Sequence, residues 1–203
     1  KPLVAALLAQ GHNIGFSKMA NSSHLNETNL RRINEVYFTH ENLCKAQRTL
    51  VNYHHSLDIV KNWGSGQSSS SDGMRVPISL KTIYADYNTH YGNKGGAMYR
   101  HISDQYMPYY IQMLEARDSV HVPDGLEYHG SDLDIKNHST DTAGYTEQTF
   151  ALLYFLGYNF RPRIKNLDQQ QLYAFQYKEI GDKKFKKINL SMSIMKLYFA
   201  HSI

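Results

Sequence analysis

The strongest constraint on the fold of this chain is a short stretch, residues 64–73, that holds too much glycine and serine to be helical. Gly64 and Gly66 precede four consecutive serines, which lead into Asp72 and Gly73. Before this stretch apolar residues recur at helical spacing, and after it the signals alternate between strand and helix. The stretch is therefore either a flexible linker or a loop that leads into a strand.

Residues 1–62 carry the helical signals. Leu30, Ile33 and Tyr37 recur at the spacing that places them on one side of a helix. Thr39 is a plausible N-cap, and Glu41 in the first turn suits the helix dipole. We expect this segment to form a helical N-terminal lead.

Residues 63–166 combine both kinds of pattern, which is typical of an α/β fold with a mixed sheet and helices on its faces. Gly95 and Gly96 predict a turn before a strand, and Gly157 is expected to end the strongest helix. Residues 167–203 resemble the start of a further helical section. The strand candidates are residues 75–80, 97–103, 135–140 and 158–164, and the helix candidates are 121–133 and 145–156.

Composition narrows the functional classes. The single Cys44 excludes an internal disulfide framework and favours a reducing, cytoplasmic compartment. No apolar run approaches the roughly 20 residues that span a bilayer, so no membrane partner is expected. The formal charge of +4 and the pI of about 9.0 permit a polyanionic partner without demonstrating one.

Two aspartates lie where α/β proteins place reactive groups. Asp72 ends the Gly/Ser stretch, and Asp141 lies between a predicted strand and the strongest predicted helix. Two adjacent carboxylates repel each other unless a cation lies between them, and Mg²⁺ suits a site of few carboxylates and water. The alternative is that both are caps, since Asp before Gly or Thr is common at turns, and pattern alone favours that reading.

Basic and histidine side chains near these aspartates leave two interpretations open. Arg161, Arg163 and Lys165 are spaced by two, so on a strand they project from one face. That face either contacts DNA phosphates or is simply solvated. His138, three residues before Asp141, either supports that site or is a core histidine.

Six segments in collinear order resemble the large transposases of class II replicative transposons, which move by forming cointegrates. The resemblance runs from about residue 3 to residue 173, and six motifs in order are far more specific than any one alone. The segments are Leu7–Gly15, Trp63-Gly64 with Ser69–Gly73, His101–Tyr106, Asp124–Leu126, Thr140–Gln148 and Phe160–Ile164.

The resemblance implies an RNase H-like catalytic core with an Asp-Asp-Glu (DDE) triad that binds two Mg²⁺ ions. Asp72 and Asp141 match the first two acids, and a histidine also stands at the position of His138 in the family. The Glu lies in the family beyond a helical insertion whose start matches residues 167–203. We therefore expect the chain to lack the third acid, to leave its metal site empty or incomplete, and to be inactive alone.

The implied enzyme nicks transposon ends and joins the resulting 3′-hydroxyls to target DNA. Its expected partners are both DNAs and further copies of the full-length protein, in the nucleoid of a bacterial cytoplasm. Arg161, Arg163 and Lys165 are the DNA-contact candidates. The alternative function is a non-catalytic DNA-binding or assembly module of a transposase-like protein.

Overall fold

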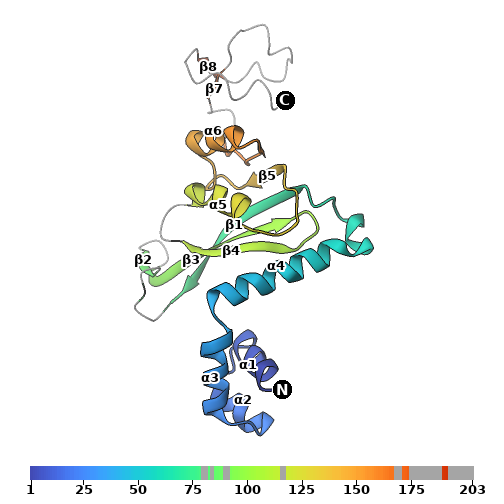
Figure 1. Ribbon diagram of the computed structural model, residues 1–203. Helices are drawn as coiled ribbons and strands as arrows, with labels where there is room; N and C mark the ends of the chain where they lie inside the picture. Colours follow the sequence, from blue (N-terminus) through green and yellow to red (C-terminus); the bar gives the residue numbers. More distant parts are fainter. Residues whose placement is uncertain are drawn as a thin grey trace. The chain divides into compact units, whose positions relative to one another are not determined.

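The computed structural model describes residues 1–78, 82, 85–88, 92–114, 118–166, 171–173 and 189–191 (Figure 1). Its contacts divide the chain into two compact units, Lys1–Leu50 and Val51–Ile203. The predicted boundaries at residues 62 and 166 stay predictions. Among the described residues, no helix is long and apolar enough to cross a membrane.

The first unit is helical, as predicted. It holds α1 (Pro2–Gly11), α2 (Phe16–Ser23), α3 (Glu27–Tyr37) and the start of α4 (His40–Ser56). Thr39 caps α4, because its Oγ1 accepts a hydrogen bond from the Asn42 backbone N–H at 3.3 Å. Small residues let the helices approach closely around the core of Ala5, Ala6, Ala9, Met19, Ala20 and Leu30.

The second unit is built on a mixed sheet, so the predicted α/β class is confirmed. Its strands are β1 (Ser68–Pro77), β2 (Asp86–Asn88), β3 (Asn93–Ser103), β4 (Pro108–Leu114), β5 (Asn137–Thr140) and β6 (Asn159–Phe160). Central strand β1 pairs antiparallel with β3 on one side and parallel with β5 on the other. Strands β2 and β4 pair antiparallel with β3 (Figure 1). Strand β6 pairs parallel with β5 and extends the parallel side.

Helices cover one face of this sheet. The unit also contains η1 (Asp58–Asn62), η2 (Asp118–Val120), α5 (Val122–Glu127) and α6 (Glu147–Phe155). The α5 helix lies so close to β3 that a methyl group placed on Gly125 would overlap the His101 ring. Apolar residues of both helices and the strands form the core, among them Tyr99, Tyr109, Val122, Leu126, Phe150, Leu153 and Phe160.

Four sequence predictions need correction. The four serines are not a loop or linker, because β1 begins at Ser68 and its residues alternate between buried and exposed. Gly95 and Gly96 lie inside β3, where a side chain on Gly95 would press within 2.5 Å of the Val76 carbonyl oxygen. Strand β4 was not predicted at all, and α5 is much shorter than residues 121–133.

The end of the described chain only partly follows prediction. Although β6 is two residues long, backbone hydrogen bonds from Arg161 N–H to the His138 carbonyl and from Arg163 N–H to the Thr140 carbonyl continue its pairing with β5. Beyond residue 166 the described residues are two short parallel strands, β7 (Gln171–Tyr173) and β8 (Asn189–Ser191). The helical section predicted for the rest of residues 167–203 lies outside the described residues.

Candidate active site

Four charged residues form a row across the sheet, two of them inside strands and two just past the ends of strands. Asp72 of β1 is paired directly with Arg100 of β3. On the other side of β1 the last registered pair is Ser71 with Thr140, and Asp72 and Asp141 are the residues that directly follow this pair. The 2.8 Å hydrogen bond from Arg163 N–H to the Thr140 carbonyl brings Arg163 to the same level. The sheet thus brings the two predicted aspartates together, with an arginine on either side.

Asp72 and Arg100 project from the face of the sheet opposite α5, and Asp141 and Arg163 are exposed just past the ends of β5 and β6. Successive strand residues alternate between faces, and in β1 Ser69 and Ser71 are buried while Ser70 and Asp72 are exposed. We call the second side the open face and define it by Ser70, Asp72, Arg100, Asp141, Arg161 and Arg163. Of these, only Arg100 is half-buried, and the other five are exposed.

Asp72 lies inside β1, four residues from its start, and not at the loop-to-strand junction that the sequence suggested. Within the described part of the chain its carboxylate has no hydrogen bond or ion pair. It is therefore not a cap, and both of its oxygens are available to a ligand.

Asp141 does cap the turn after β5, whereas the N-cap of helix α6 is Thr146. The Oδ1 atom of Asp141 accepts hydrogen bonds from the backbone N–H groups of Ala143 and Gly144, at 3.0 and 3.1 Å. A side chain on Gly144 would press against Thr140, so a glycine suits this tight turn. The turn holds the carboxylate in place and leaves Oδ2 without a partner among the described residues. Asp141 can thus cap the turn through Oδ1 and still offer Oδ2 to a metal ion.

The donor set fits a hard divalent cation incompletely. Two exposed carboxylates on adjacent strands supply the oxygen ligands that such a cation prefers. No group of three His, Cys, Asp or Glu side chains among the described residues could hold a metal ion. The described site therefore offers two protein ligands.

His138 lies on the opposite, buried face and does not point toward the carboxylates. Its Nδ1 and Nε2 are 2.7 Å and 2.8 Å from the hydroxyls of Ser69 and Ser71, and Ser71 is 2.7 Å from the Tyr99 hydroxyl. Burial lowers the pKa of His138 to about 3, so the ring is neutral near pH 7. This network joins β1, β3 and β5 directly behind the row, and it explains how a run of serines is accommodated in a strand.

His101 completes the buried face. Its ring stacks on His138 with centroids 5.1 Å apart and meets Tyr99 edge-on at 5.3 Å. Burial, followed by the nearby His138, lowers its pKa to about 2. Neither ring nitrogen has a hydrogen-bond partner among the described residues. His101 therefore packs as an aromatic ring under Gly125.

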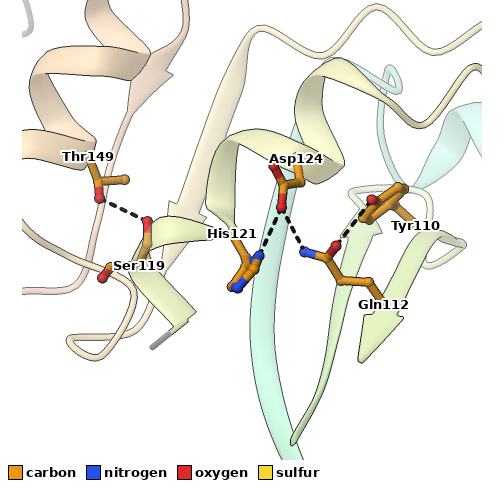
Figure 2. Close-up of polar contacts among 6 residues, drawn as sticks. All are labelled: Tyr110, Gln112, Ser119, His121, Asp124 and Thr149. Atoms are coloured by element: carbon orange, nitrogen blue, oxygen red, sulfur yellow. Dashed lines mark hydrogen bonds and ion pairs between the residues drawn. The ribbon is translucent and has the colours of Figure 1, made fainter. Parts of the chain in front are cut away.

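Asp124, another acid in a recognised motif, is not part of the row. Figure 2 shows its Oδ2 accepting from Gln112 Nε2 at 3.2 Å and lying 2.9 Å from His121 Nδ1. Gln112 is paired with Tyr99 in the sheet and so belongs to the helix-covered face. The carboxylate thus ties α5 to β4. In the same view Thr149 of α6 donates to the Ser119 carbonyl at 2.9 Å.

The three predicted basic residues lie beyond the end of β6, not within a strand, so their projection from one strand face stays a prediction. Arg161, Arg163 and Lys165 are exposed and alternate with half-buried neighbours. Arg100 was missed, since nothing in the local sequence reveals which residue of β3 faces Asp72. Only the β1–β3 register could have identified it.

The mixed sheet, with a central strand that pairs antiparallel on one side and parallel on the other, agrees with an RNase H-like domain, the class of the family whose model the chain matches. The chain matches the family model for the Tn3 transposase DDE domain over residues 1–196. It belongs to that family, whose members are DNA transposases and whose DDE domain implies the use of a divalent metal.

Named relatives agree with this assignment. The chain is 45% identical over 176 residues to the transposase for transposon Tn1546 of Enterococcus faecium, covering 85% of this chain and 18% of that protein. It is 42% identical over 175 residues to the transposase for Tn2501 of Escherichia coli, with 84% and 18% covered. For the gamma-delta transposase of Escherichia coli strain K12 the identity is 33% over 168 residues, with 80% and 17% covered. The chain thus spans less than a fifth of the length of these relatives.

Proposed function

We propose that this chain supplies the first two metal-binding carboxylates of a DNA transposase that nicks transposon ends and joins their 3′-hydroxyls to target DNA. The observation that supports the proposal is the register of β1 and β5, whose last pair, Ser71 with Thr140, directly precedes Asp72 and Asp141. Paired carboxylates on an exposed face repel each other and cost stability unless they bind a cation.

Mg²⁺ is the cation that we propose, held by Asp72 and Asp141 together with water and DNA phosphate oxygens. When bound, a pair of such ions activates the attacking oxygen and stabilises the leaving oxygen of an in-line displacement. Asp141 is held ready by its turn, whereas Asp72 is fixed by the strand itself. The triad's third acid is expected outside the described residues.

The protein's own contribution to DNA binding is the exposed basic strand end. Arg161, Arg163 and Lys165 leave the sheet next to Asp141, where they would contact backbone phosphates. His138 lies on the buried face, where its hydrogen bonds to Ser69 and Ser71 hold β1 against β5. In this way it would set the spacing of the two aspartates.

The partners that follow are transposon ends, target DNA and further copies of the full-length protein, acting at the bacterial nucleoid. Two DNA ends must be brought to one target, which requires more than one active site. These assignments rest on the family and on the basic residues beside the carboxylates.

The test is Mg²⁺-dependent 3′-end nicking by the full-length protein carrying Asp72→Asn or Asp141→Asn. The amide oxygen that Asp141→Asn introduces can still accept the two turn hydrogen bonds, so this change removes the charge and keeps the cap. We expect nicking to fall about 10³-fold, equivalent to about 4 kcal/mol of transition-state stabilisation. Asp134→Asn, which removes an exposed carboxylate paired with Lys136, is the matched control. Retained nicking in either site variant rejects the proposal.

A further inference from the structure

Arg100 is a charged residue of the open face that lies next to the proposed chemistry and has no assigned role. It is paired with Asp72 across the β1–β3 ladder, so both side chains project from the same face. The Arg100 side chain makes no hydrogen bond or ion pair among the described residues. Its five N–H donors are thus available to another ligand.

The simplest alternative is that Arg100 only balances the charge of Asp72 and supports strand pairing. Opposite charges on directly paired residues do contribute to sheet stability. In that case the two groups would be expected to form an ion pair, and none joins them in the described structure. A second arginine, Arg163, occupies the corresponding place on the far side of the carboxylates.

The spacing of the row suits a nucleic-acid strand. Neighbouring strands lie about 4.8 Å apart, so the backbones of Arg100 and Arg163 are separated by three such intervals, about 14 Å. Measured along the helix axis, that distance spans about four base-pair steps of B-DNA at roughly 3.4 Å each, so the two arginines would contact different phosphates. A guanidinium group binds a phosphate through two parallel hydrogen bonds, which fix orientation as well as position.

We propose that Arg100 binds a backbone phosphate on the Asp72 side of the bond to be cleaved, while Arg163 binds another on the Asp141 side. The inference rests on the proposed function, because the carboxylate pair marks where the cleaved bond lies. Two contacts on opposite sides fix the strand along its length, so the correct phosphate lies over the carboxylates. One contact alone allows the strand to shift.

The experiment measures binding of the full-length protein to transposon-end duplexes that carry one uncharged methylphosphonate at successive positions, without divalent metal. The unmodified protein is expected to be sensitive to the modification at several positions. Two of them, one on either side of the cleavage site, should each lower the affinity about 10-fold. Arg100→Gln removes the sensitivity at one of these two positions and retains it at the other. Arg163→Gln shows the reverse pattern, and Arg100→Lys restores part of the lost sensitivity.

Arg75→Gln is the control, because Arg75 lies on β1 but on the opposite face from Asp72 and carries the same charge as Arg100. This variant is expected to keep both flanking positions sensitive. The inference is overturned if Arg100→Gln also keeps both, or if its losses are spread evenly over all positions. Because no metal is present, the result is independent of the nicking test: normal nicking by Asp141→Asn would reject the proposed function and leave this binding result standing.

Discussion

The two faces of the central sheet are built from the same strands but differ in burial and charge. On the buried face, His138, Ser69, Ser71 and Tyr99 share short hydrogen bonds and carry no net charge. On the open face, Asp72 and Asp141 are charged and exposed, and only the turn after β5 contacts either carboxylate in the described chain. Successive side chains of a strand point to opposite faces of the sheet. Residues that stabilise the fold and residues proposed for chemistry can therefore be direct neighbours in the sequence.

A consequence is that substitutions on the two faces should differ in kind. Changes on the buried face are expected to alter the free energy of unfolding, whereas changes on the open face are expected to alter DNA binding or catalysis at nearly constant stability.

The largest expected effect is the pH dependence of stability. His101 and His138 have lowered pKa values in the folded state, so between pH 6.5 and about 3 the unfolded chain binds more protons and stability falls as pH falls. From pH 7 to pH 5 we expect a loss of about 2 kcal/mol for each histidine. Chemical unfolding followed by the fluorescence of the single tryptophan, Trp63, measures it.

Surface carboxylates do not contribute to the expected change in the free energy of unfolding between pH 7 and pH 5. The pKa values of Glu41 and Asp58 are lowered by hydrogen bonds to Lys45 and Lys61, so these groups affect stability only below about pH 4.5. A free energy of unfolding that stays constant between pH 7 and pH 5 would show that the two histidines are not buried as neutral rings.

Gly125→Ala should be the most damaging single substitution on the buried face. The added methyl group overlaps His101, whose ring is held by His138 and Tyr99 and has little room to move. We expect a loss of about 3 kcal/mol in the free energy of unfolding. Gly11→Ala, where a methyl group meets nothing within 4 Å, serves as the control and should not destabilise.

Phenylalanine in place of each buried histidine should give different results. His138→Phe removes two hydrogen bonds and leaves the Ser69 hydroxyl buried, so we expect a loss of about 2 kcal/mol. His101→Phe removes no hydrogen bond in the described structure and should change stability by less than about 1 kcal/mol in either direction. Urea denaturation compares the two, and equal losses would contradict the network described for His138.

The smallest effect is expected for Arg161→Gln on the open face. Loss of one phosphate contact should reduce the slope of log affinity against log salt concentration by about 0.9, with stability unchanged. Salt titration of DNA binding by the full-length protein provides the measurement. Lys61→Gln, which removes a cation already paired with Asp58, should leave the slope as it is.

How far the sequence predicted these features depends on whether the signal was local. Helix α6 and its stop at Gly157 follow from local apolar spacing and a glycine at positive φ. The start of β1 was misjudged because serine disfavours regular structure unless its hydroxyls find partners, and these partners come from β5 and β3. Arg100 could not be found for the same reason, since strand register is a non-local property.

The most direct test of the central claim replaces Asp72 or Asp141 by cysteine in the full-length protein and compares nicking in Mg²⁺ and Mn²⁺. A thiolate is a poor ligand for Mg²⁺ and a better one for softer cations. We predict that each cysteine variant is inactive in Mg²⁺ and regains part of its nicking in Mn²⁺, while Asp134→Cys nicks equally well with either ion. Nicking in Mg²⁺ at the parent rate by either variant would contradict the assignment of these two aspartates as metal ligands.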